Sequence, residues 1–407
     1  MTPEVRDRIE QIRHGNVPEG YKKTAAGIIP VDWQCSTIRD CLQIKNNERK
    51  PISEEVRKTI PGPYPYYGPT QAQGYIDTFV SEGPAVLIGE DGDHFLKYKT
   101  KPMTLFVDGK YTVNNHAHMV VGTEKCATKW FFYAYQYKSL LNAITRQGAG
   151  RFKLTKEALE RLHVQFPCPA EQERILAIIF EQDRVIELKE KLMIEKRRQK
   201  KYLMQQLLTG KKRLPGFDGE WMHVRANQIF KNVTDKKHDG TLEVLSATQD
   251  RGIIPRSQVD IDIKYAEESL SGYKKVVKGN FVISLRSFQG GIEYSEYTGI
   301  VSPAYTVLAS VYPIEDNFYK QFFKSVDYIN RLNIAVYGIR DGKQISYDDF
   351  GRIKIPYPPL EEQKAIAEVL TTADREIEIL KKTIEQEKQK KKALMQLLLT
   401  GVVRVKI

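Results

Sequence analysis

The sequence predicts an α+β protein with two mixed α/β globular domains and a pair of long antiparallel coiled-coil helices, arranged with pseudo-twofold symmetry. Three observations carry this prediction: a long internal repeat, a heptad pattern of apolar residues inside the repeat, and short strand-like runs outside it. With 407 residues, of which 41% are hydrophobic, the chain is long enough for two or three packed domains.

The internal repeat joins two segments at a constant offset of 191 residues. Residues 166–210 and 357–401 align without a gap, roughly two positions in five are identical, and both segments end in Leu-Leu-Thr-Gly. A looser match joins residues 27–33 to residues 214–221. The chain therefore consists of two copies of one unit, and the two globular regions hardly resemble each other. The predicted domains are 1–165 (a globular domain with an N-terminal leader), 166–213 (a helix), 214–356 (a second globular domain) and 357–407 (a second helix).

Each repeated segment predicts one long helix. Prolines precede both copies, acidic residues occupy the first turns, and Gly210 and Gly401 are expected as C-terminal caps. Apolar residues recur at alternating steps of four and three, which is typical of supercoiled helices, and about 39 residues give a rod of roughly 58 Å. An intramolecular antiparallel pair is favoured because one chain carries both helices; a generic dimerisation coiled coil is the alternative. The predicted contact positions are Ile175, Ile179, Gln182, Ile186, Lys189, Met193, Leu203 and Leu207 in the first copy, and Ile366, Leu370, Ala373, Ile377, Leu380, Ile384, Leu394 and Leu398 in the second.

The globular regions contain many short strand-like runs separated by Gly, Pro and Asp clusters, which predicts mixed α/β domains. The clearest runs are residues 85–88, 103–107, 281–284 and 306–308. Aromatic residues are plentiful in both regions, and most of them are expected in the core or on a sheet face.

The charge balance indicates a polyanionic partner. The formal net charge is +12, and Lys or Arg placed on phosphates releases condensed counterions, so a nucleic acid is the favoured partner; a solubilising excess is the alternative. The lysine-rich stretches 196–201 and 388–392 are either a solvated face or a contact surface. No apolar run is long enough to cross a membrane, and four cysteines without a C-x-x-C pair or a signal peptide favour a cytoplasmic protein.

Polar residues in the loops of both globular regions are candidates for reading base edges. Arg matches guanine, and Asn or Gln match adenine, because their paired hydrogen-bonding groups fit those major-groove edges. The candidate DNA-binding residues are Gln71, Gln73, Asn114, Asn115, Arg146 and Arg151 in the first domain, and Arg256, Gln258, Arg286, Gln289, Arg340 and Lys343 in the second.

Catalytic signatures are not apparent in the sequence. Residues 338–343 come nearest to a phosphate-binding loop but have the wrong spacing, and Pro-Tyr-Pro-Pro at 356–359 lacks the polar leader of an adenine methyltransferase motif. The pair His116 and His118 has no carboxylates at a defined spacing beside it. We therefore expect no catalytic site, no bound metal and no cofactor in this chain.

Several motifs together resemble type I restriction-modification specificity subunits over essentially the full length. They are Gly-Ile-Ile-Pro-Val-Asp-Trp at 27–33, Pro-Tyr-Tyr-Gly at 65–68 with Gly-Tyr-Ile-Asp at 74–77, Ile-Gly-Glu-Asp-Gly at 88–92, Val-Asn-Asn-His-Ala-His at 113–118, and the doubled Pro…Glu-Gln…Ile and Leu-Leu-Thr-Gly segments. The leader at residues 1–19 has no counterpart before the second globular region.

The resemblance implies that the partner is double-stranded DNA and that each globular domain is a target recognition domain for one half of a bipartite, asymmetric site. It implies that the helices are the conserved spacer, which docks two methyltransferase subunits and, through them, restriction and translocase subunits. S-adenosylmethionine, ATP and Mg would then belong to these partners. Two alternatives remain: the recognition module of a single-chain restriction-methylation enzyme, and a coiled-coil DNA-associated scaffold.

Overall fold

Two helices of 39 residues each stand out in the computed structural model, and they coincide with the repeated segments. They are α6 (Pro169–Leu207) and α12 (Leu360–Leu398). Gly210 and Gly401 follow them with φ of 69° and 72°, a left-handed conformation that glycine adopts without a steric penalty, so both predicted caps are confirmed. The structure describes residues 2–147, 151–239, 241–259, 267–285, 287, 291–336 and 345–405.

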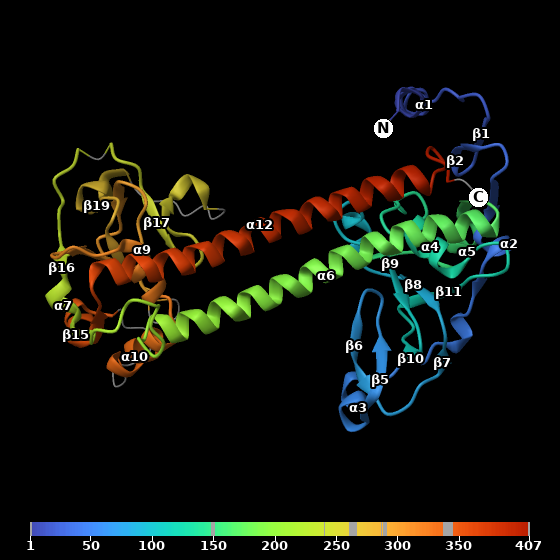
Figure 1. Cartoon of the computed structure of the whole chain (residues 1–407). Coiled ribbons are helices and arrows are strands. Elements are labelled where there is room, and N and C mark those ends of the chain that lie inside the picture. Colours follow the sequence, from blue (N-terminus) through green and yellow to red (C-terminus); the bar gives the residue numbers. More distant parts are fainter. Residues whose placement is uncertain are drawn as a thin grey trace. The chain divides into compact units, whose positions relative to one another are not determined.

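The chain divides into two compact units, residues 1–188 with 384–407, and residues 189–383. In the first unit, the beginning of α6 lies against the end of α12 (Figure 1). Gln182 Nε2 donates to Glu387 Oε2 at 2.8 Å, and Lys391 Nζ lies 2.6 Å from Asp183 Oδ1. Residue numbers rise along one helix as they fall along the other, so this pairing is antiparallel.

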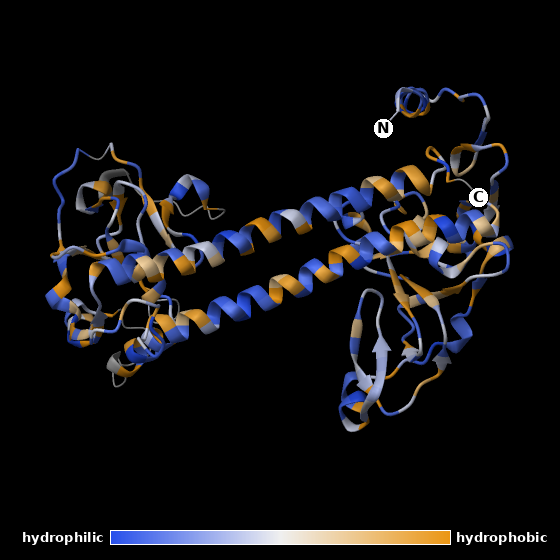
Figure 2. Ribbon diagram, viewed as in Figure 1, coloured by the Kyte–Doolittle hydropathy of each residue, from blue (hydrophilic) through white to orange (hydrophobic). Residues whose placement is uncertain are grey.

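The second unit contains the complementary halves of both helices. Lys196 Nζ lies 2.8 Å from Glu376 Oε2, and Lys200 Nζ lies 2.6 Å from Asp374 Oδ1, again with antiparallel polarity. These two lysines belong to a stretch for which the sequence left the role open, and they pair across the helices. Hydrophobic and hydrophilic residues alternate along both helices (Figure 2). Of the predicted contact positions, those that are buried are Ile175, Ile179, Gln182, Ile186, Leu207, Ile366, Leu370, Ile384 and Leu398. The predicted antiparallel pairing within one chain is confirmed.

The globular part of the first unit contains two four-stranded sheets, in the orders β6-β5-β10-β7 and β4-β11-β8-β9. Strand β8 is buried along its whole length, as its run of apolar residues predicts. The elements are α1 (Pro3–Arg13), β1 (Tyr21–Thr24), β2 (Gly27–Pro30), β3 (Gln34–Thr37), α2 (Ile38–Cys41), β4 (Gln43–Ile44), η1 (Asn46–Glu48), α3 (Glu54–Thr59), β5 (Pro61–Tyr67), β6 (Ala72–Ile76), β7 (Ser81–Glu82), β8 (Ala85–Gly89), η2 (Asp93–Lys97), β9 (Thr104–Val107), β10 (Lys110–Val113), β11 (Ala117–Val121), α4 (Thr128–Tyr135), β12 (Thr145–Gln147), β13 (Arg151–Lys153), α5 (Lys156–Arg161) and β14 (His163–Phe166).

The globular part of the second unit is built on one four-stranded sheet, in the order β16-β23-β20-β21. A cluster of aromatic rings around Phe230 forms the core beneath it. The elements are β15 (Met222–Arg225), α7 (Ala226–Ile229), β16 (Phe230–Val233), β17 (Leu245–Thr248), β18 (Gly252–Pro255), η3 (Arg256–Gln258), η4 (Glu267–Gly272), β19 (Lys274–Val276), β20 (Phe281–Ile283), β21 (Glu293–Tyr294), β22 (Gly299–Val301), β23 (Thr306–Ser310), α9 (Asp316–Phe322), α10 (Val326–Val336), α11 (Tyr347–Arg352) and β24 (Lys354–Tyr357).

Both globular parts share a frame that their sequences do not reveal. The strand that enters each domain pairs antiparallel with the strand that precedes its long helix, β3 with β14 and β15 with β24. A short helix follows each entry strand, and its first residue donates to the loop before the exit strand: Ile38 N to Leu162 O at 2.8 Å, and Ala226 N to Ile353 O at 2.9 Å. The predicted fold class is confirmed, and the two copies share more structure than the sequence predicts.

The four strand-like runs all form strands, β8, β9, β20 and β23. Among the residues that the structure describes, no helix is long and apolar enough to cross a membrane.

Candidate nucleic-acid interface

In the first domain, polar side chains gather where the β5–β6 hairpin meets the end of β10. Gly68 N donates to Gln71 O at 2.9 Å and closes the hairpin tip, and Asn114 N donates to Tyr67 O at 3.0 Å. Gln73 and Asn114, which are 41 positions apart, meet here: Asn114 Nδ2 donates to Gln73 Oε1 at 3.2 Å. Strand pairing therefore brings together residues that the sequence could only place in separate loops.

A second polar group adjoins this edge through the loop after β8. Glu90 N donates to His116 O at 2.8 Å, and the His116 ring lies 2.8 Å from Asp91 Oδ2. Arg49 Nη1 binds Glu90 Oε2 at 2.7 Å and Asn115 O at 3.1 Å. These contacts hold the loops in one arrangement before any ligand binds, and such preorganisation lowers the entropic cost of binding.

The predicted residues of the first domain differ in exposure. Gln71, Gln73, Asn115 and Arg146 are exposed, whereas Asn114 is only 5% exposed. Arg146 belongs to the β12–β13 hairpin, which is tied to the same loop because Gly92 N donates to Phe152 O at 3.0 Å. Arg151 is the first residue of β13, and its side chain lies outside what the structure describes.

Sequence reasoning missed Arg49, Glu90, Asp91 and His116. Glu90, Asp91 and His116 lie inside the motifs at 88–92 and 113–118, but only their contacts in space show that they support the loop. His118, considered as a metal ligand, uses both ring nitrogens internally: Nδ1 lies 2.9 Å from Asn46 Nδ2 and Nε2 lies 2.7 Å from Leu154 O.

In the second domain, Arg256 and Gln258 form η3 directly after β18. Gln258 is exposed, and its backbone oxygen accepts from Arg251 Nη2 at 3.1 Å. Gln258 and Arg251 line a cavity of about 830 Å³, together with Lys320 and Lys324. Acidic residues line the same cavity, and Lys320 and Lys324 pair with two of them, Glu296 and Glu293. The hollow therefore contains charges of both signs, and Arg251 and Gln258 are its groups suited to a nucleic acid. Of the other predicted residues, Arg286, Gln289, Arg340 and Lys343 lie outside the described part of the chain.

One of the residues that line this cavity is a buried acid. Glu293 is 2% exposed and pairs with Lys324, while its Oε2 has no hydrogen-bond partner among the described residues. Burial raises the pKa of the Glu293 carboxyl above its ordinary value of 4.5. The native state therefore holds this proton more tightly than the unfolded chain does.

We expect the Glu293 contribution to stability to be fully present below pH 4.5 and to be lost as pH rises through the raised pKa. Glu293→Gln removes this dependence. As pH rises above 4.5, the urea midpoint of the wild type should therefore fall relative to that of the variant. Glu296→Gln is the control, because Lys320 lowers the pKa of that carboxyl and the sign reverses. Parallel pH profiles for Glu293→Gln and wild type would contradict the expectation.

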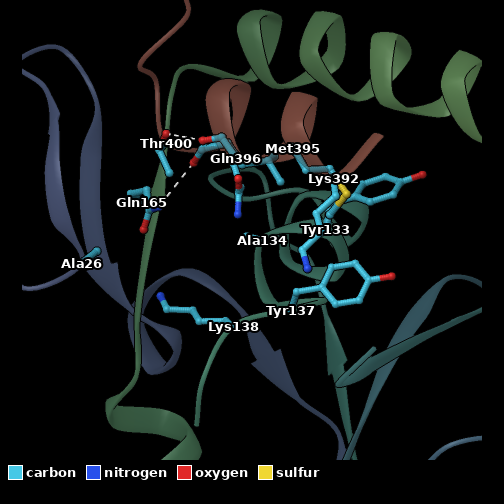
Figure 3. Close-up of a pocket in the computed structure, with 11 residues that line it drawn as sticks. Ala26, Tyr133, Ala134, Tyr137, Lys138, Gln165, Lys392, Met395, Gln396 and Thr400 are labelled. Atoms are coloured by element: carbon cyan, nitrogen blue, oxygen red, sulfur yellow. Dashed lines mark hydrogen bonds between the residues drawn. The ribbon is translucent and has the colours of Figure 1, made fainter. Parts of the chain in front are cut away.

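A smaller cavity of about 280 Å³ lies in the first unit beside the last turns of α12. Figure 3 shows Tyr133, Tyr137, Lys138 and Lys392 around it. Lys392 Nζ lies 5.4 Å from the centre of the Tyr137 ring, and burial lowers the pKa of Lys138. The cavity therefore belongs to the seam between the first domain and α12.

The junction between each domain and its helix contains the same buried cluster. In the first unit, Trp33 Nε1 donates to Glu171 Oε2 at 3.3 Å, and Arg404 binds both Glu171 oxygens at 2.7 and 2.8 Å. These hydrogen bonds to Glu171 raise the pKa of the Arg404 guanidinium. Arg404 also binds Asp32 at 2.7 and 2.9 Å. Bidentate Arg–carboxylate geometry is strong and directional, so this cluster fixes the start of α6.

The second unit repeats the cluster with Trp221, Glu362 and Arg213. Trp221 Nε1 donates to Glu362 Oε2 at 2.8 Å, and Arg213 binds the two Glu362 oxygens at 2.6 Å each. Arg213 and Arg404 are separated by the repeat offset of 191 residues. This constant offset was the feature of the sequence from which their equivalent roles could have been predicted.

Gln172 and Gln363, which follow these glutamates in the two long helices, make equivalent hydrogen bonds in the two units. The Gln172 side chain accepts from Ala127 N at 3.0 Å and donates to Pro167 O at 3.0 Å. Gln363 does the same with Glu315 N at 2.9 Å and Pro358 O at 2.8 Å. Ala127 and Glu315 are the N-cap residues of α4 and α9, so the repeated Glu-Gln pair couples a domain helix to each long helix.

Comparison with known proteins places these features in a family context. Residues 30–195 and 219–389 match the family described as type I restriction modification DNA specificity domain. A type I restriction enzyme specificity subunit of Haemophilus influenzae is 27% identical, over 91% of this chain and 95% of the relative. The MjaX specificity subunit of Methanocaldococcus jannaschii is 25% identical, over 95% and 97%. The S subunit structure from M. genitalium has the same fold, with a TM-score of 0.54 at 15% identity, covering 92% of this chain and 97% of that one.

Proposed function

Because the chain belongs to the family of type I restriction-modification DNA specificity proteins, it is a DNA-recognition component, and we propose that its two domains read the halves of a bipartite, asymmetric site. The observation that carries this proposal is that the two domains share one backbone arrangement but expose different polar residues. Both domains hold their long helix through the same Trp–Glu–Arg cluster. The first domain exposes Gln71, Gln73 and Asn115, whereas the described part of the second exposes Arg251 and Gln258. Two different readers on one support suit two different half-sites.

We further propose that the long helices dock two methyltransferase subunits and, through them, restriction and translocase subunits. Ile178, Val185 and Leu192 recur every seven residues on α6 and are 41%, 36% and 48% exposed. An exposed apolar stripe with this period suits a partner helix. S-adenosylmethionine, ATP and Mg are proposed to belong to those partners, so that this chain binds DNA in the cytoplasm and performs no chemistry itself.

The test is single-molecule methylome sequencing of cells that carry the cognate methyltransferase gene, with and without the gene for this chain. A gapped, two-part methylated motif that appears only with this chain is the expected result. An unchanged pattern, or a motif of one short block, contradicts the proposal and favours the coiled-coil scaffold. If this chain methylates DNA without the methyltransferase gene, the single-chain enzyme is favoured instead.

A further inference from the structure

The orientation of one exposed amide in the first domain follows from a single unambiguous donor. The backbone N–H of His116 can only donate, and it lies 2.9 Å from the Asn114 side-chain oxygen. The Asn114 amide is therefore fixed with its Nδ2 toward Gln73, and the Gln73 atom that meets it at 3.2 Å must be the acceptor Oε1. Asn114 is 5% exposed, so water does not compete freely for these bonds.

Gln73 is also held from the other side. The backbone of Gly68 lies directly beneath its side chain, because a Cβ added at Gly68 would meet Gln73 Nε2 at 2.4 Å and Cδ at 2.6 Å. Gln73 is exposed, and among the described residues its Nε2 has no hydrogen-bond partner. The Gln73 oxygen is therefore occupied by Asn114, and its NH₂ is the group left to bind an acceptor on a ligand.

We propose that Asn114 is a positioning residue for base recognition, which fixes Gln73 as a hydrogen-bond donor toward an acceptor on the DNA. This inference rests on the proposed function, since it concerns how the first domain reads its half-site. In the major groove, guanine presents the acceptors O6 and N7, thymine presents O4 and adenine presents N7 beside its N6 donor, whereas cytosine presents only the N4 donor. A donor-only Gln73 therefore contacts a base with an acceptor and disfavours cytosine.

The test inverts the amide without changing its size. In Asn114→Asp the carboxylate still accepts from His116 N but has no donor for Gln73, so Gln73 turns its Nε2 inward and presents Oε1 outward. The preference at one position of the first half-site should shift from guanine or thymine toward cytosine, by about tenfold or more in relative affinity, whereas adenine, which presents both a donor and an acceptor, should change less. The readouts are the methylated motif and binding of duplexes that differ at that position, both measured on the complex with the cognate methyltransferase.

A second variant reaches the same outcome from the other side of the bond. Gln73→Glu leaves Asn114 in place but presents only an acceptor, so it should shift the same position in the same direction. Asn142→Asp is the matched control, because it adds the same charge at an exposed position of the first domain outside this cluster. The second half-site, read by the other domain, should stay unchanged in every variant.

Three results would overturn the inference. The first is an unchanged base preference in an active Asn114→Asp complex, and the second is an equal shift in Asn142→Asp. The third applies if Asn114→Asp does not fold, and it is an unchanged base preference in Gln73→Glu. A wild-type complex without any two-part motif would instead contradict the proposed function itself, so the two failures are distinguishable.

Discussion

Replacing Glu362 with alanine is expected to lower the free energy of unfolding of the second unit by about 3–5 kcal/mol. The Glu362 side chain is fully buried and accepts from Arg213 twice and from Trp221 once. Its removal leaves a guanidinium, 23% exposed, and an indole N–H without their acceptor. A charge left without its partner in a mostly buried position costs far more than a lost surface contact. Urea denaturation followed by circular dichroism measures the free energy of unfolding of the variant and the wild type.

Glu361 provides a matched control one residue away. Its side chain is 75% exposed and only pairs with Lys364 on the same helix face, so Glu361→Ala should change stability by less than about 0.5 kcal/mol. Equal losses in the two variants would show that the buried cluster does not stabilise the junction. Because Glu171 has the corresponding place in the first unit, Glu171→Ala should behave like Glu362→Ala.

Replacing Phe230 with alanine is expected to cost about 3–5 kcal/mol and to abolish reading of the second half-site. The Phe230 ring is fully buried, and its centre lies 5.2, 5.5 and 5.5 Å from those of Tyr319, Phe281 and Phe323. The cavity left by alanine sits at the centre of this aromatic core, which cannot collapse without moving several rings. Thermal unfolding measures the loss of stability, and methylome sequencing measures the loss of reading.

Tyr312→Ala is the control for Phe230→Ala, since it also truncates an aromatic residue of the second domain but at a position 57% exposed. It should keep both the melting temperature and the two-part motif. A Phe230→Ala protein with wild-type stability would refute the assignment of this ring as the centre of the core. Loss of both half-sites together would show that the domains do not read independently.

Much of the architecture could be predicted from the sequence because it depends on local periodicity. The gapless repeat, the alternating steps of four and three, and the glycines after the last turns predicted α6, α12 and their antiparallel pairing. Apolar runs predicted β8 and β20 in the same way. These signals lie within a few turns or one strand, so a single sequence contains them in full.

The site itself depended on contacts between distant residues. From the sequence, Gln73 and Asn114 were equivalent candidates for contacting bases. Strand pairing buries Asn114 and leaves Gln73 exposed, and His116 N orients the Asn114 amide, which in turn orients Gln73. The frame shared by both domains, and the closure of each Trp–Glu pair by Arg404 or Arg213, likewise join residues far apart in the chain. Sequence by itself determined the repeated helical support, because helix periodicity is local. Only the tertiary structure decided which polar groups are presented and which are buried, because strand register and packing bring distant side chains together.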